Sequence, residues 1–386
     1  MEVKESLASA SAYARTTLLT PAGHTRGEYD LLGGVWRTYE PAWHTGQLIW
    51  GLLESRRVTG DDADLAAARR AGDWWASLQY TDPGPLRGFL RAEHGAEVGS
   101  LINFTTIADG APGLFALSRA TGDDHYADVA TDAGAWGAEH LYVPEHGVIY
   151  DLINSTTGAV LDTDDPSPHF ADDYELSLFD VTRPNNEGFL YYDMFKHTGD
   201  SAYLEVFRGL SDALVRYQDT VSGFWMDFHP NSVAKNKVHA RSNTWYAESL
   251  LRAYEAFGDE KYLRSALRLA RAVADWQTRE GGVYYGQRYS GPPDRRSLSG
   301  SAAAFAGILW LELSQLGYPE FDERIHRTAC WLIANQFPAD HPDPNVRGGY
   351  LETWRKNDAR ERLWVRDIAT AFGLRFLARY HGWLPS

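Results

Sequence analysis

Two helical patterns of hydrophobic and polar residues alternate along this chain and predict two layers of helices. In the first pattern, apolar residues three and four positions apart alternate with Arg, Asp and Glu, which predicts helices with one buried and one wet face. It occupies residues 62–80, 201–219 and 260–277. The second pattern is apolar on most faces and rich in Gly and Ala, as expected of closely packed inner helices. It occupies residues 42–58, 103–120, 185–197, 242–257, 300–316 and 368–381.

The paired patterns recur about every sixty residues, and each repeat ends on a similar turn. The six turns are RVTGD (57–61), RATGD (119–123), KHTGD (196–200), AFGDE (256–260), QLGYP (315–319) and YHG (380–382). Gly suits the left-handed position just past a helix end, so each turn predicts the end of an inner helix. Six helical hairpins predict an all-α fold, a single (α/α)6 barrel, because an open solenoid needs polar capping repeats and has no reason to stop at six. We therefore expect residues 1–386 to form one catalytic domain.

Short loops rich in Gly and aromatic residues precede most of the inner helices. They cover residues 83–95, 145–154, 222–230, 280–289 and 347–354. Such β-prone pieces form turns that can line a concave surface, so we expect short β-rich loops at the barrel mouth. The longer segment 158–177 is expected to be a loop insertion and a candidate lid.

The bulk properties of the chain narrow its partners and its location. Its net charge of −15 and its pI near 5.3 argue against nucleic acid and anionic membranes as partners. The N-terminus lacks the basic flank and apolar run of a signal peptide, and no apolar stretch is long enough to span a bilayer. The single cysteine, Cys330, excludes an intrachain disulfide and is expected to be a buried packing residue. We therefore expect a cytoplasmic protein, and its oligomeric state stays open.

In such a barrel the amino ends of the inner helices converge on one mouth, so their polar and aromatic residues should share a pocket. These residues are Tyr39, Glu40, Trp43, His44, Asn103, Asp109, Asp180, Arg183, Asn185, Asn186, Glu187, His239, Arg241, Asn243, Trp245, Arg295, Arg296, Ser297, Trp364, Arg366 and Asp367. The set joins carboxylates and cations with aromatic rings, and the whole chain holds 14 Trp and 21 Tyr. Aromatic faces stack on sugar rings, while Asn, Asp and Arg bind hydroxyl and carboxylate groups. The pattern favours a carbohydrate site over simple aromatic packing.

Asp180 and Glu187 are the carboxylates best placed for acid–base chemistry. Segment 180–200 predicts a helix whose start carries both residues. Glycosidic chemistry needs a carboxyl group whose pKa is raised by apolar neighbours, and Phe189 could supply such surroundings. Asp180 could equally cap the helix, and Glu187 could be a first-turn acid favoured by the helix dipole. Asp109 is expected to be a supporting carboxylate.

Arg241 is the candidate clamp for a sugar carboxylate. The segment HARSNTWYAESL (239–250) places Arg, Asn and Trp at one helix start, and Arg holds a carboxylate in a bidentate fork. The alternative is an ion pair of Arg241 with Glu248 or with an acidic residue of a loop. Further substrate contacts are expected from the stacking platforms Trp43, Trp245 and Trp364, and from His44, Asn103, Asn186, His239, Asn243, Tyr246 and Arg366.

The sequence indicates no metal or cofactor site. The histidines lack metal-ligand spacing such as HExxH, and the chain has neither a phosphate-cradling GxxxxGK[ST] motif nor a dinucleotide fingerprint. We therefore expect neither a metal ion nor an organic cofactor.

Two helix starts resemble those of the unsaturated glucuronyl and rhamnogalacturonyl hydrolases. ARSNTWYAESL (240–250) is similar to their Arg-Gly-Asn-Gly-Trp helix start, with Ser242 and Thr244 in place of the glycines. LSGSAAAFAGILWLEL (298–313) is similar to their Ser-Ser-Ala-rich inner helix, and the repeated Thr-Gly-Asp ends match as well. The resemblance implies an (α/α)6 barrel in which an Asp at the third inner-helix start hydrates the double bond of a 4,5-unsaturated uronic acid.

The resemblance also implies positions for the family's two aspartates. Counting back from Thr198 places Thr182 near the first of them, with Asp180 two residues upstream and Glu187 downstream. The second falls near Thr105, one helical turn from Asp109.

We therefore expect a glycoside hydrolase that acts on acidic, uronic-acid-containing oligosaccharides, of the unsaturated glucuronyl or galacturonyl hydrolase or glucuronidase type. A polysaccharide lyase on the same barrel would use Tyr246, His239 and Asn243 around the proton that it removes. A sugar epimerase of the N-acylglucosamine type would use paired histidines, for which His239 is the candidate. A non-catalytic glycan-binding protein would keep its affinity after loss of both Asp180 and Glu187.

Overall fold

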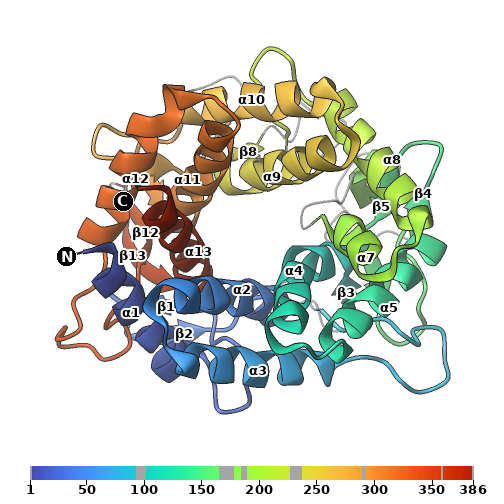
Figure 1. Cartoon of the computed structure of the whole chain (residues 1–386), viewed down its shortest axis with the longest axis horizontal. Helices are drawn as coiled ribbons and strands as arrows, with labels where there is room; N and C mark the ends of the chain where they lie inside the picture. Colours follow the sequence, from blue (N-terminus) through green and yellow to red (C-terminus); the bar gives the residue numbers. More distant parts are fainter. Residues whose placement is uncertain are drawn as a thin grey trace.

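The computed structural model describes residues 2–92, 101–164, 178–183, 189–226, 237–288, 292–357 and 360–384. Within them, the two predicted layers of helices close into a ring (Figure 1). The inner layer holds α2 (Pro41–Thr59), α4 (Phe104–Thr121), α7 (Leu190–Thr198), α9 (Ala240–Phe257), α11 (Gly300–Gln315) and α13 (Asp367–Trp383). The outer layer holds α1 (Val3–Tyr13), α3 (Asp62–Ala76), α5 (His125–His140), α8 (Ser201–Tyr217), α10 (Glu260–Ala274) and α12 (Asp322–Ala334). This is the predicted (α/α)6 barrel, and it closes because α13 packs against both α11 and α2.

A recurring turn joins an inner helix to the outer helix that follows it. After α2, α4, α7 and α9 a glycine takes the left-handed conformation, with φ between 68° and 76°. An Asp then caps the next helix: Asp61 accepts a hydrogen bond from the main-chain N–H of Ala63, and Asp200 and Asp259 do the same at α8 and α10. The Gly-Asp pair therefore ends one helix and starts the next. The sixth expected end is wrong, since Gly382 lies inside α13.

Short strands form at the amino ends of the inner helices, as the Gly-and-aromatic loops predict. The largest sheet is antiparallel, with the order β2-β1-β13-β12-β11-β9. Its strands are β1 (Glu28–Asp30), β2 (Val35–Arg37), β9 (Val283–Tyr284), β11 (Ser297–Ser299), β12 (Leu351–Asn357) and β13 (Arg360–Arg366). Smaller sheets pair β3 (Leu101–Asn103) with β6 (Leu152–Asn154), β8 (Lys237–His239) with β10 (Gly286–Arg288), and β4 (Tyr142–Val143) with β5 (Val148–Tyr150) and β7 (Thr182–Arg183). Because β3, β8, β11 and β13 run directly into α4, α9, α11 and α13, they fix where those helices begin.

The third inner helix starts later than the sequence predicts. Asp180 lies in a separate short helix, α6 (Leu178–Val181), and the two residues that follow this helix form β7. Thr182 and Arg183 pair with Tyr150 and Ile149 of β5, so their main-chain groups belong to a sheet and are not available to a helix. Helix α7 therefore begins only at Leu190.

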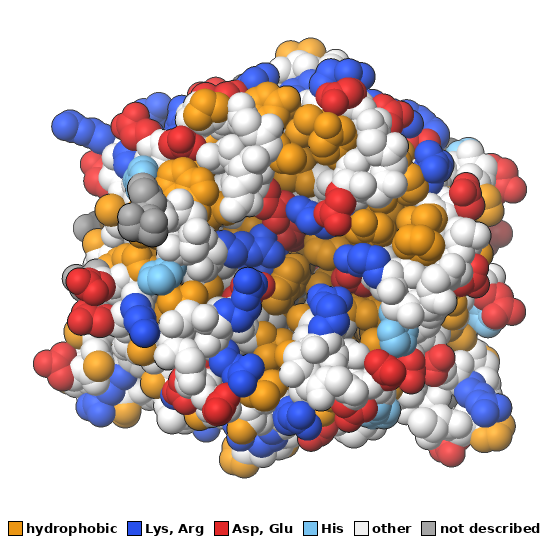
Figure 2. All heavy atoms as spheres, viewed as in Figure 1, with side chains coloured by type: hydrophobic (Ala, Val, Ile, Leu, Met, Phe, Trp, Pro, Cys, Tyr) orange, Lys and Arg blue, Asp and Glu red, His pale blue; other side chains and the backbone are white. Residues whose placement is uncertain are grey.

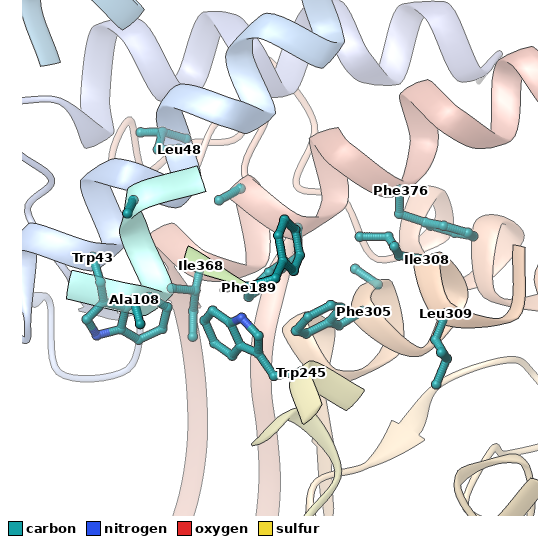
Figure 3. Close-up of a cluster of buried hydrophobic side chains, with 14 of the residues drawn as sticks. Trp43, Leu48, Ala108, Phe189, Trp245, Phe305, Ile308, Leu309, Ile368 and Phe376 are labelled. Atoms are coloured by element: carbon teal, nitrogen blue, oxygen red, sulfur yellow. The ribbon is translucent and has the colours of Figure 1, made fainter. Parts of the chain in front are cut away.

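The axis of the barrel is filled by apolar side chains of the inner helices. Figure 3 shows Trp43, Phe189, Trp245, Phe305 and Ile368 pointing toward one another, and each is at most 5 % exposed. The Trp245 ring lies edge-on to the rings of Trp43 and Phe305, with centroids 5.3 Å apart in both pairs. Packing of this kind closes the middle of the barrel, so a ligand site has to lie at one of its ends.

The carboxyl ends of the inner helices enclose a cavity of about 570 Å³ that contains Arg57, Arg252 and Arg379. Arg57 is paired with Glu54 at 3.0 Å, Arg252 and Arg379 are both paired with Glu312 at 2.6 Å, and Arg252 is also paired with Glu255 at 2.6 Å. Although burial of Glu312 opposes its ionisation, the two guanidinium groups hold its pKa below the ordinary value. Figure 2 shows Lys and Arg side chains bordering the hollow at the centre of one face of the ring, with Asp and Glu among them. Because the charges at the carboxyl ends neutralise one another, the opposite end of the barrel is the better candidate for a ligand site.

The outer helix α12 corrects the expectation for the single cysteine. Cys330 is exposed, and so are Glu323 and His326, which precede it by seven and four residues. Residues at this spacing share one face of a helix, and here it is the solvent face. None of the helices in the described segments is long and apolar enough to cross a membrane.

Candidate active site

The amino ends of the inner helices enclose a cavity of about 340 Å³. Its walls come from α2, α4 and α9, from β8, and from the loops that precede α9 and α11. The lining residues are Tyr39, Glu40, Trp43, Asn103, Thr105, Thr106, Asp109, Trp225, Met226, Lys237, His239, Arg241, Ser242, Asn243, Trp245, Tyr246 and Tyr285. The residues expected there from the sequence and found in this lining are Tyr39, Glu40, Trp43, Asn103, Asp109, His239, Arg241, Asn243, Trp245 and Tyr246.

Glu40 begins the α2 wall in a strained conformation. It has φ 43° and ψ 55°, a left-handed backbone that a residue with a side chain adopts at a cost of about 1–3 kcal/mol. The residue is 6 % exposed, and its carboxylate accepts a 2.7 Å hydrogen bond from Nε1 of Trp43. Burial and the nearby Glu40 carboxylate raise the pKa of Tyr39 to about 12, so the phenol keeps its proton. Strain of this kind concentrates at functional sites, which makes Glu40 a candidate site residue.

Arg241 brings a cationic group into the cavity. Its guanidinium lies 5.6 Å from the centre of the Trp43 ring. Its Nε and Nη1 groups are buried and have no hydrogen-bond partner within the described residues. The alternative partner expected from the sequence, Glu248, is instead bonded to Arg375 at 2.6 Å. The guanidinium of Arg241 can therefore receive an acceptor from a ligand.

The α4 wall supplies a carboxylate, Asp109, which is 6 % exposed and lines the cavity. Asn103 caps the helix by accepting a 2.8 Å hydrogen bond from the N–H of Thr106. Thr105 is bonded through both its main-chain N–H and its hydroxyl to Asp151 of the neighbouring loop. Gln47 of α2 donates to the main-chain oxygen of Asp109, so the two helices are joined at the level of the site.

The fourth repeat supplies the remaining wall. The ring of His239 stacks on that of Tyr285 with centroids 4.9 Å apart. Asn243 was expected to contact substrate, but its side-chain amide is hydrogen-bonded to main-chain groups. It accepts from the N–H of Trp225 at 2.6 Å and donates to the main-chain oxygen of Trp225 at 2.9 Å. Its role in the cavity is to hold the Trp225 segment against α9.

His44 does not line the cavity, although the sequence places it among the substrate contacts. It is fully buried behind Trp43, whose ring centroid lies 4.0 Å from its own. Its Nδ1 is 3.0 Å from a carboxylate oxygen of Asp367, the first residue of α13. Burial lowers the pKa of His44 even though Asp367 opposes the shift. His44 therefore joins α2 to α13 beneath the site.

Trp364 and Arg366 also lie outside the cavity lining, because both belong to the six-stranded sheet. Arg366 stacks on Tyr39 at 4.7 Å, and the Trp364 ring is flanked by Arg37 and Arg362 at 5.7 and 4.9 Å. Arg366 therefore adjoins the cavity through its contact with Tyr39.

Five further residues expected in the site cannot be placed in it. Asn185, Asn186 and Glu187 lie outside the described residues, and for Asp180 in α6 and Arg183 in β7 only the backbone is described. The cavity lining also contains residues that were not predicted from the sequence, namely Trp225, Met226, Lys237 and Tyr285. Their signal was present, since the Gly-and-aromatic loops 222–230 and 280–289 carry three of them. Within the described segments, no group of three or more His, Cys, Asp or Glu side chains is arranged to hold a metal ion.

Comparison with known proteins gives matches at the level of structure. No protein-family model and no curated protein sequence matches the chain. The cellobiose 2-epimerase of Bacillus thermoamylovorans B4167 superposes with a TM-score of 0.76 at 13 % identity over 98 % of both chains. A D-mannose isomerase gives 0.72 at 14 % identity over 99 % of this chain and 97 % of the other. The unsaturated glucuronyl hydrolase of Bacillus sp. GL1, responsible for the degradation of glycosaminoglycan, gives 0.67 at 15 % identity over 98 % and 97 %. These likenesses confirm the (α/α)6 fold and include the group that the helix starts resemble.

Proposed function

We propose that this chain is a carbohydrate-active enzyme, a glycoside hydrolase that acts on oligosaccharides carrying a uronic acid. The observation that carries the proposal is Arg241, a cation on an aromatic face whose buried N–H groups have no partner within the described residues. A sugar carboxylate supplies the missing acceptors and fits the guanidinium fork.

The surroundings of Arg241 favour an anionic sugar. Trp43, Trp245 and Tyr246 line the cavity and form its aromatic floor, with at most 4 % of each residue exposed. The amino ends of α2, α4 and α9 point at the cavity, and each carries about half a positive charge from the aligned peptide dipoles. The local field therefore attracts a carboxylate although the chain as a whole carries a net charge of −15.

The proposed acid–base group in the described part of the cavity is Asp109. Its burial among apolar helices suits a carboxyl group that exchanges a proton with the substrate. Asp180 and Glu187 remain candidates for the general acid, as the helix-start resemblance implies. Glu40 is a second cavity carboxylate, held in place by Trp43.

A sugar epimerase or isomerase is the second candidate, and His239 is the observation that favours it. An imidazole can remove a proton next to a carbonyl group and return it to the other face. His239 lines the cavity and its ring orientation is set by stacking on Tyr285. The fold is also shared with a cellobiose 2-epimerase and a D-mannose isomerase.

The test is incubation with a panel of uronate oligosaccharides, half with a 4,5-unsaturated end and half saturated. Ultraviolet absorbance follows the conjugated double bond, and released reducing sugar is measured in parallel. Falling absorbance on the unsaturated set supports the hydrolase, and release of sugar without an absorbance change supports a glucuronidase. Rising absorbance on the saturated set indicates a lyase and refutes the proposal. A changed sugar configuration without bond cleavage indicates the epimerase.

Two variants test the assigned roles. Asp109→Asn should lower kcat by about 100-fold or more, because it removes the proton-transferring carboxyl group. Arg241→Gln should lower kcat/KM for a uronate by about 10- to 100-fold, the worth of a charged hydrogen bond, and leave turnover of the matching neutral glycoside unchanged. Arg57→Gln, which removes an exposed arginine at the opposite end of the barrel, is the control.

A further inference from the structure

We propose that the six-stranded sheet carries a second binding surface, which holds further anionic residues of the same oligosaccharide outside the cavity. The surface, named here the arginine strip, consists of Arg37, Arg355, Arg362, Trp364 and Arg366. The inference rests on the proposed function, because it extends the substrate from one uronic acid to an anionic chain of several units.

Strand register places the five residues on one face of the sheet. Successive residues of a strand point to opposite faces, so Arg362, Trp364 and Arg366 of β13 share a face. Arg37 and Arg366 both pair with Glu28, and Arg355 pairs with Arg362. Figure 1 shows β12 and β13 beside β1 and β2. At about 3.4 Å per residue, the three β13 side chains cover about 14 Å.

At Arg355 and Arg362 the strip holds more positive charge than its described ion-pair partners neutralise, whereas Arg366 lies near Glu28 and the buried carboxylates of Glu352 and Asp367. Arg37 faces Asp30 at 3.6 Å, Arg366 faces Glu28 at 3.5 Å, and Arg355 faces Asp294 at 3.6 Å. Asp294 is shared with Arg296, which lies closer at 2.9 Å. Arg362 has no ion pair within the described residues and lies opposite Arg355. Like charges directly opposite each other destabilise a sheet, and an anionic ligand between them would remove that cost.

The strip offers the same chemistry as the cavity. Trp364 lies between the guanidinium groups of Arg37 and Arg362, an aromatic surface for a sugar ring with a cation on each side for its acidic groups. The Nε1 group of Trp364 and the Nε group of Arg355 are buried without a hydrogen-bond partner within the described residues. These donors can be satisfied by sugar hydroxyl, carboxylate or sulfate oxygens.

The strip is continuous with the cavity through Tyr39. Arg366 is packed on the Tyr39 ring at 4.7 Å, and Tyr39 lines the cavity. A chain whose terminal uronic acid is held by Arg241 can therefore leave the cavity past Tyr39 and follow β13. The net charge of −15 argues against nucleic acid or an anionic membrane as the occupant of such a short positive surface.

The test compares a uronate disaccharide with a hexasaccharide of the same repeat. Arg362→Ser removes the least neutralised cation and should raise KM for the hexasaccharide by about 5-fold, as expected for a partly exposed charge contact. The disaccharide KM and kcat on both substrates should stay unchanged. Arg362→Lys should restore most of the affinity, and raising the salt concentration should shrink the difference between variants. Arg69→Ser, on the outer helix α3, is the control for loss of one arginine.

The outcomes separate this inference from the proposed function. Turnover of the disaccharide with an equal effect of Arg362→Ser on both lengths, or with no effect on either, overturns the strip and leaves the proposed function standing. Absence of turnover on every uronate overturns the proposed function. In that case calorimetry with the hexasaccharide still decides the strip, because weaker binding by Arg362→Ser supports it and unchanged binding refutes it. Tight binding of duplex DNA or anionic vesicles through the strip would also refute the assigned occupant.

Discussion

The buried ion pair between Arg375 and Glu248 should be among the most sensitive points of the molecule. Arg375 is fully buried and Glu248 is 2 % exposed, with Nη2 and Oε1 separated by 2.6 Å. Arg375 also donates to Gln47 at 2.9 Å and stacks on Trp50 at 3.6 Å. Gln47 in turn donates to the main-chain oxygen of Asp109, so the pair supports the floor of the cavity.

The magnitude follows from burial. Arg375→Met leaves the Glu248 carboxylate in an apolar interior without its cation, which costs about 3–5 kcal/mol for a buried pair. For a chain of this length the entropy of unfolding is about 0.8 kcal/mol/K, so Tm should fall by about 5 °C. Arg375→Met combined with Glu248→Met removes both charges. We expect it to cost only about 1–3 kcal/mol, chiefly from the unsatisfied oxygen of Gln47.

The assay is a double-mutant cycle in chemical denaturation, with activity measured on the same samples. We expect a coupling free energy of at least about 2 kcal/mol between the two positions. Arg375→Met should also lose activity, because Gln47 loses the guanidinium that orients it toward Asp109. Arg57→Met, which breaks a pair whose arginine is 77 % exposed, should cost at most about 1 kcal/mol. Additive single effects, or a cost for Arg375→Met no larger than that of the control, would refute the reasoning.

Three further predictions concern packing, pH and strain. Gly110→Ala would place a Cβ 2.4 Å from the Trp75 ring and 2.8 Å from Cα of Trp43. We therefore expect the free energy of unfolding to fall by about 1–3 kcal/mol and the activity to fall as well. Gly382→Ala, whose Cβ would have no atom within 4 Å, should be neutral in the same denaturation assay. His44 has a lowered pKa, so below pH 6.5 the unfolded chain binds a proton that the folded chain excludes. The free energy of unfolding should therefore fall with decreasing pH by up to about 1.4 kcal/mol per pH unit. If His44→Asn showed the same dependence of the free energy of unfolding on pH, this account would be contradicted. Glu40→Gln keeps an acceptor for Trp43 and should leave Tm within about 1 °C while kcat/KM falls by at least about 10-fold; equal activity would remove Glu40 from the site.

The fold could be predicted because its determinants are local. A glycine that takes φ near 70° and an Asp that accepts from an N–H two residues on need only their own neighbours, so the pair at 60–61 can end one helix and cap the next without a long-range contact. The contrast between amphipathic and apolar segments then assigns each helix to the outer or inner layer. Arg241 and Trp43 could be selected on the same grounds, since both stand at inner-helix starts.

The sequence by itself therefore determined the repeat, the two helix layers, the barrel and the end of it that carries polar residues. Only the tertiary structure decided which partner each polar side chain has. Glu248 could pair with Arg241 on its own helix, yet it pairs with Arg375, and His44 meets Asp367 across the closure of the ring. The late start of α7 likewise depends on a long-range contact, since β7 pairs with β5, which lies more than thirty residues earlier in the chain. Hydrogen bonds and ion pairs reach only about 3 Å, so residues far apart in sequence become partners only once the whole ring has closed.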